Sequence, residues 1–101
     1  MRNIWVDLKE ERDRQDIKFP DQHIPSFPVQ MDFAHAIAEM EQAQELTDRV
    51  AAKGLVTWWH VLREEFYEAC AEPDVAKLRD ELVQVAAVAI RWIEDLDRDR
   101  A

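Results

Sequence analysis

The residues best suited to chemistry are oxygen-bearing side chains gathered between positions 57 and 96. One predicted helix carries Glu64, Glu65 and Glu68, and the next carries Glu81 and Gln84. Carboxylate and amide oxygens are the ligands that Mg²⁺ and Mn²⁺ prefer, and facing helices can supply them to one ion. The pattern therefore predicts a divalent-metal site, through which an acidic protein could hold phosphate groups.

Helical wheels place two of these acids on otherwise apolar arcs. Glu65 falls between Val61 and Ala69, and Glu81 falls between Val88 and Trp92. A carboxylate on a buried arc is costly unless a partner compensates its charge. An antiparallel pair of helices would bring Glu65 and Glu68 opposite Glu81 and Gln84. The alternative is a set of ordinary salt bridges to nearby arginines, for which the candidates are Arg63, Arg79 and Arg91.

Hydrophobic periodicity predicts the four helices that must position these residues, at 3–17, 33–52, 58–71 and 74–97. Asp32 and Thr57 are suitable N-caps for the second and third helices. Gly54, the only glycine, lies where a helix C-cap favours a positive φ angle. Pro73 lies at the start of the fourth helix, where its missing N–H is harmless.

Two of the helices carry apolar surfaces of unusual extent. The helix at 33–52 has a narrow, alanine-rich face that suits close packing against another helix. The helix at 74–97 is apolar around most of its circumference. A helix of that kind lies at the centre of a bundle or is shared between subunits, so we expect a dimer.

The segment 19–32 contains three of the four prolines and is predicted to be an extended loop. Loops of this length in compact domains are often functional. We expect its apolar side chains to pin it across a pair of helices; these are Phe19, Ile24, Phe27 and Val29.

Composition restricts the class of protein. A chain of 101 residues with 48% hydrophobic residues and one glycine predicts a single all-α domain spanning 1–101. The net charge of −9 disfavours a nucleic-acid-binding surface, because phosphate neutralisation needs clustered Lys and Arg. Cys70 stands alone, and no signal peptide or membrane-spanning run is recognisable, so we expect a cytoplasmic protein without membrane partners.

The string REEFYEACAEPDVAKLRDELVQVAAVAI is similar to the MazG-like all-α nucleoside triphosphate pyrophosphohydrolases. The hallmark of that family is EExxE on one helix and ExxD on the next. Glu64, Glu65 and Glu68 match the first half, and Glu81 matches the glutamate of the second. The resemblance extends to RQDIKFPDQ and TWWHVL and leaves 33–53 as an inserted helix. It implies a four-helix MazG-like bundle completed by dimerisation.

The resemblance also implies hydrolysis of nucleoside triphosphates to monophosphate and pyrophosphate with Mg²⁺ (or Mn²⁺). Glu65, Glu68 and Glu81 would then be metal ligands, and Glu64 would orient or deprotonate the attacking water. Gln84 replaces the family's aspartate; its amide oxygen can still bind a cation but carries no charge.

The remaining candidates would contact the nucleotide itself. Arg12, Gln15 and Lys18 recur at three-residue spacing, so they can reach one neighbour. With Gln22 they are candidates for phosphate or base contacts, and Trp58 is a candidate for stacking on a base. Gln84 favours an alternative in which the same scaffold binds a nucleotide without cleaving it. A third interpretation is a helical interaction module whose acids are merely solvated.

Overall fold

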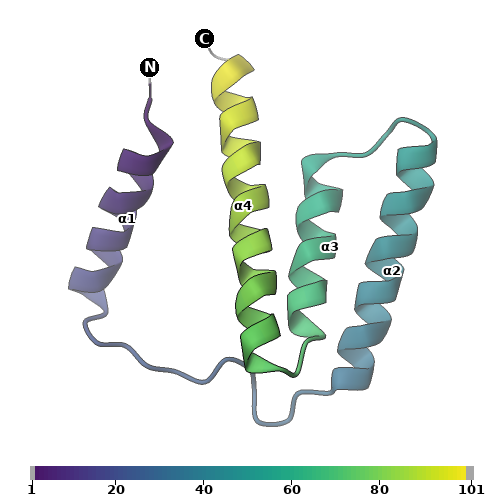
Figure 1. The fold of residues 1–101 in the computed structure, drawn as a ribbon, viewed down its shortest axis with the longest axis horizontal. Helices are drawn as coiled ribbons and strands as arrows, with labels where there is room; N and C mark the ends of the chain where they lie inside the picture. The colour runs from purple at the N-terminus through teal and green to yellow at the C-terminus, as the bar shows by residue number, and fades with distance from the viewer. Residues whose placement is uncertain (1, 100–101) are drawn as a thin grey trace. The chain divides into compact units, whose positions relative to one another are not determined.

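The computed structural model describes residues 2–99, and within that range it contains four helices and no strand. The helices are α1 (Ile4–Lys18), α2 (Phe33–Ala52), α3 (Trp58–Cys70) and α4 (Val75–Asp99) (Figure 1). The predicted all-α class and the number of helices are confirmed; the bounds of α2 match the prediction, and the other helix ends differ from it by at most two residues. Within residues 2–99 no helix is both long enough and apolar enough to cross a membrane.

Local hydrogen bonds explain where α2 and α3 begin and end. The Asp32 carboxylate accepts the His35 N–H at 3.2 Å. At the start of α3, Thr57 Oγ1 accepts the His60 N–H at 3.4 Å, and His60 Nδ1 accepts the Thr57 N–H at 3.1 Å. Gly54 follows α2 with φ +70°, a conformation that glycine adopts without a side-chain penalty. Both predicted N-caps are therefore confirmed, and so is the positive φ angle of Gly54, which directly follows the C-cap residue Lys53.

The chain divides into two compact units. The larger unit is Asp32–Trp92, and the smaller one combines the described residues up to Met31 with those from Ile93 onward. In the larger unit α2, α3 and the adjoining part of α4 lie side by side and alternate in direction (Figure 1). Short connections, 53–57 and 71–74, enforce this antiparallel order. The prediction of one domain with an inserted helix at 33–53 stays a prediction.

The fully buried core of the described residues is small. It consists of Ala36 and Ala43 on α2, Ala69 on α3 and Leu78 on α4. Alanine lets two helix backbones approach closely, which accounts for the packing of α2 against α3. Large apolar side chains of the same unit remain exposed, among them Trp59, Phe66, Val75, Leu82 and Val83.

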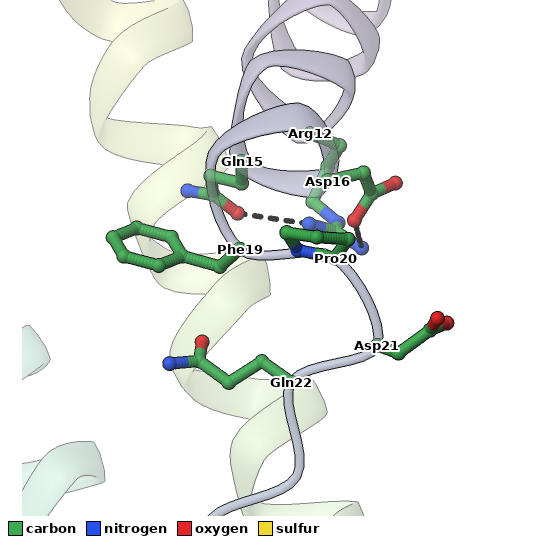
Figure 2. A pocket seen from close by; sticks show the side chains of 7 residues that line it. All are labelled: Arg12, Gln15, Asp16, Phe19, Pro20, Asp21 and Gln22. Atoms are coloured by element: carbon green, nitrogen blue, oxygen red, sulfur yellow. Dashed lines mark hydrogen bonds and ion pairs between the residues drawn. The ribbon is translucent and has the colours of Figure 1, made fainter.

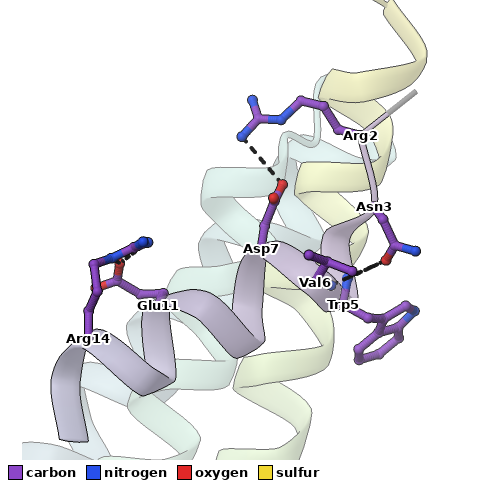
Figure 3. Close-up of polar contacts among 7 residues, drawn as sticks. All are labelled: Arg2, Asn3, Trp5, Val6, Asp7, Glu11 and Arg14. Atoms are coloured by element: carbon purple, nitrogen blue, oxygen red, sulfur yellow. Dashed lines mark hydrogen bonds and ion pairs between the residues drawn. The ribbon is translucent and has the colours of Figure 1, made fainter. Parts of the chain in front are cut away.

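In the smaller unit, α1 has its own N-cap and a set of exposed ion pairs. The Asn3 side chain caps the helix by accepting the N–H groups of Trp5 and Val6 at 3.0 and 3.3 Å (Figure 3). Ion pairs along the helix surface add to this cap; Figure 3 shows Arg2–Asp7 and Glu11–Arg14. None of the residues Ile4–Lys18 is fully buried.

The predicted anchoring of the 19–32 loop by its apolar residues is wrong. Ile24 is 67% exposed, Val29 is 100% exposed and Phe19 is also exposed, whereas Phe27 is half-buried. The segment changes direction instead of running straight: Asp21 has φ +52°, and the Met31 N–H donates to the Pro28 carbonyl oxygen at 3.0 Å in a second turn. Its apolar side chains therefore do not share one buried surface.

Candidate functional site

Three glutamates converge where α3 faces α4. Glu65 and Glu68 lie almost one turn apart on α3, and Glu81 lies in the second turn of α4. One carboxylate oxygen from each lies within 4.8 Å of the other two, and all three residues are half-buried. The turn through Pro73, which makes α3 and α4 antiparallel, thus brings together Glu65 and Glu81, which are 16 positions apart in the sequence.

Two oxygens of this cluster lack a hydrogen-bond partner. Glu65 Oε2 and Glu81 Oε2 are buried and accept no hydrogen bond. Buried polar atoms are almost always satisfied, and either a cation or a proton would satisfy an orphaned pair beside a third carboxylate. Hard oxygen donors within one ion's reach fit Mg²⁺ or Mn²⁺, which would complete its shell with water or a ligand oxygen.

The cluster also favours protonation when no cation compensates its charge. Desolvation, followed by repulsion from Glu68, Glu81 and Glu64, raises the pKa of Glu65 to about 7. Desolvation and the charge of Glu68 likewise raise the pKa of Glu81. The three groups cannot all ionise without strong mutual repulsion.

Glu64 lies on a different side of α3. Desolvation is the main reason why the pKa of Glu64 is raised. Two residues of α2 act on the same pKa: the Thr47 side chain lowers it, and the charge of Asp48 raises it. The proposed water-activating residue is therefore held beside α2, next to the three-glutamate cluster in sequence but outside it in space.

Helix α2 supplies polar contacts that sequence reasoning missed. Gln44 Nε2 donates to Glu68 Oε1 at 3.3 Å, and Thr47 Oγ1 donates to the His60 carbonyl oxygen at 3.4 Å. The sequence did contain a signal for these contacts: Gln44 and Thr47 are polar, lie three positions apart, and adjoin Ala43 and Leu46 on the alanine-rich face. These contacts tie α2 to the acidic residues of α3.

The arginines near the cluster interact with aromatic rings. The Arg63 guanidinium lies 5.6 Å from the Trp59 ring centroid and 5.3 Å from that of Tyr67. The Arg91 guanidinium lies 5.8 Å from the ring centroid of half-buried Trp58. The ring of Trp58, the candidate for base stacking, thus already interacts with the Arg91 guanidinium of its own chain. Neither guanidinium group donates a hydrogen bond to the two orphaned carboxylate oxygens.

Gln84 lies one turn beyond Glu81 on α4 and is exposed. Positions three apart on a helix lie on neighbouring sides of it, so the amide is close to the direction of Glu81. Its exposure shows that the fourth position of the motif is the most solvated one.

The candidate substrate-binding residues of α1 meet at a cavity in the smaller unit. Arg12, Gln15 and Gln22 line a space of about 770 Å³ at the end of α1 (Figure 2). Lys18 does not line it; its ammonium lies 5.3 Å from the centroid of the Phe19 ring. The cavity and the three-glutamate cluster belong to different compact units.

Comparison with known proteins identifies no relative: no family model, no curated protein and no solved structure matches the chain.

Proposed function

We propose that the chain is a Mg²⁺-dependent nucleoside triphosphate pyrophosphohydrolase of the MazG-like type. The observation that carries the proposal is the convergence of Glu65, Glu68 and Glu81 with two buried, unpartnered oxygens. Solvated surface acids, as in an interaction module, would keep their oxygens in water. The resemblance of EExxE and its downstream glutamate to the family motif supplies the reaction class.

Each acidic residue has a role in this proposal. Glu65, Glu68 and Glu81 hold the cation, and the Gln44 amide orients Glu68 through its hydrogen bond. The family resemblance gives Glu64 the role of orienting or deprotonating the attacking water; its carboxylate has a raised pKa but lies outside the three-glutamate cluster, so this role requires the water to reach it from the cation. Bound Mg²⁺ neutralises phosphate oxygens and lowers the pKa of water.

A nucleotide-binding protein that sequesters its ligand uncleaved is the second candidate. Gln84 favours it, because this position is neutral where the family has an aspartate. The quartet of Glu65, Glu68, Glu81 and Gln84 then carries three formal charges, so a second metal ion would bind weakly. Binding through one ion tolerates this loss better than catalysis that needs two.

Pyrophosphate release from a panel of nucleoside triphosphates with Mg²⁺ or Mn²⁺ tests the proposal. We expect release by the native chain and at least a hundredfold loss in Glu68→Gln. Glu45→Gln, an exposed change on α2, is the matched control and should keep full activity. Tight binding with the nucleotide recovered unchanged would establish the second candidate. If the chain neither binds a nucleotide nor releases pyrophosphate, and metal ions do not shift its Tm, both candidate functions are rejected.

We also propose that the chain forms a homodimer through a groove between α3 and α4. Trp59, Leu62, Phe66 and Val85 surround this groove of about 280 Å³. Trp59 is 53% exposed and Phe66 is 52% exposed, although both are large apolar side chains. Four small or medium buried side chains are a small core for residues 2–99, so a second copy covering the groove would supply further burial. A cytoplasmic location for this dimer is part of the same proposal.

A further inference from the structure

The groove between α3 and α4 contains one charged side chain, Arg63, which lies among the apolar residues of its lining. Its guanidinium lies over the rings of Trp59 and Tyr67, and within residues 2–99 no carboxylate forms an ion pair with it. A second copy that covers the groove would remove this half-buried cation from water. Such a charge is costly unless the covering surface supplies an acid. The occupant must therefore combine an apolar side chain with a carboxylate.

The stretch Asp21–Pro25, in the loop that follows α1, has this composition. Ile24 is 67% exposed, and residues 22–25 form neither a helix nor a turn. Pro25 disfavours the helical conformation at the residue before it, so the Ile24 side chain projects from an extended backbone. Pro20 and Pro25 also restrict the chain before binding, which lowers the entropy that the stretch loses on docking.

Asp21 supplies the carboxylate of this stretch. It lies at a turn with φ +52°, and none of the described basic side chains forms an ion pair with it. Figure 2 shows the Asp21 side chain directed away from those of Phe19 and Gln22. Three residues of extended chain span about 10 Å. The Asp21 carboxylate can therefore reach a cation at the edge of a groove while Ile24 lies inside it.

We infer that the stretch Asp21–Pro25 of one copy docks in the α3–α4 groove of a second copy. Ile24 enters the apolar part of the lining, and Asp21 pairs with Arg63. In a two-fold symmetric dimer the exchange is reciprocal, so each groove receives the stretch of the other copy. The inference rests on the proposed homodimer and identifies the segment that covers its groove.

Sedimentation velocity on the full chain tests the apolar contact. We expect Ile24→Asp to weaken association at least tenfold, because the new carboxylate would be desolvated in an apolar groove. Val29→Asp is the matched control and should leave association unchanged, since Val29 is fully exposed and lies beyond the bend at 26–27. Equal association of the native chain and Ile24→Asp would overturn the inference.

A double-mutant cycle tests the ion pair. Asp21→Asn and Arg63→Gln should each weaken association about threefold, the size of a partly exposed ion pair. Asparagine tolerates the positive φ angle at this position, so the first variant removes the charge without straining the turn. The double variant should associate no more weakly than Arg63→Gln alone, because the two side chains act on each other. Additive losses would overturn the pairing and the inference with it.

Mixed dimers show which copy supplies the stretch. A ¹⁵N-labelled chain is mixed with an unlabelled chain that carries a spin label on Ser26→Cys, and Cys70→Ala in both removes the native thiol. We expect paramagnetic broadening of the Trp59 indole signal, which only the other copy can cause. Absence of broadening in a mixture that dimerises would overturn the inference.

Failure of the inference can be distinguished from failure of the proposed homodimer. A native dimer that Trp59→Asp dissociates and Ile24→Asp leaves intact would reject the docking stretch alone. A native chain that is monomeric at high micromolar concentration would reject the homodimer, and the inference with it. Pyrophosphate release tests the proposed hydrolase separately from both.

Discussion

Glu65 bears most of the electrostatic strain in the acidic cluster. It is desolvated, it faces two other carboxylates, and one of its oxygens is buried without a partner. Such a residue destabilises the metal-free fold when ionised and becomes favourable when a cation binds. The same carboxylate therefore links stability to pH and, if the proposed cation binds, to metal.

Replacing Glu65 with glutamine should stabilise the metal-free protein at pH 8, because the variant removes a desolvated like charge. A gain of about 1 kcal/mol corresponds to a rise in Tm of roughly 4–8 °C for a domain of this size. The variant should also lose the rise in Tm that Mn²⁺ causes in the native chain. Differential scanning calorimetry measures both effects, and Glu45→Gln is the control. A lower Tm together with an intact Mn²⁺ response would contradict the metal assignment.

The metal-free protein should lose stability as pH rises from 5 to 8. The pKa of Glu65 is about 7 in the folded chain and near the ordinary 4.5 when unfolded. The folded state therefore binds the proton more tightly, and stabilisation from this group is complete below pH 4.5 and lost as pH rises through 7. Thermal melts in EDTA across this range measure the effect. A Tm that stays flat or increases between pH 5 and 8, or one that Mn²⁺ fails to restore at pH 8, would contradict the prediction.

At the scale of elements, α2 contributes more than packing. Its alanines allow close approach to α3, and this approach places Gln44 beside Glu68 and Thr47 beside Glu64. A helix that looked like an insertion therefore orients the acidic residues of its neighbour.

Gln44→Ala should weaken Mn²⁺ binding roughly tenfold, the lower end of what the loss of a ligand-orienting hydrogen bond costs in metal affinity. Calorimetric titration of Mn²⁺ measures the change. Gln42→Ala is the matched control, since Gln42 lies on the exposed side of the same helix. Unchanged affinity in Gln44→Ala, with helix content preserved, would show that the amide does not position Glu68.

At the scale of the whole molecule, the exposed apolar groove between α3 and α4 is the feature that a single copy leaves unexplained. Trp59 and Phe66 lie on the side of α3 that faces neither α2 nor the glutamate cluster. Covering them on association would remove two large apolar side chains from water, which favours association.

Trp59→Asp should convert a dimer into monomers, because a charge in the groove would be desolvated on association. Sedimentation velocity measures the change, and we expect at least a hundredfold weaker association. Val29→Asp is the control, since Val29 is fully exposed in the 19–32 loop. A native chain that is monomeric at high micromolar concentration, or a Trp59→Asp variant that still dimerises, would reject the proposed interface.

The sequence by itself determined the helices, since caps, proline positions and apolar periodicity act locally. Asp32, Thr57 and Gly54 marked helix ends, and the wheel positions of Glu65 and Glu81 predicted acids on apolar arcs. These features depend on neighbours within one or two turns, so they can be read from spacing alone.

Only the tertiary structure decided which oxygens meet and which remain unpartnered. The pairing of Gln44 with Glu68 across 24 positions, the separation of Glu64 from the cluster and the exposure of Ile24 and Val29 all depend on how distant segments approach. No local pattern encodes such distances, because they follow from the close packing of α2 on α3 and the antiparallel turn between α3 and α4.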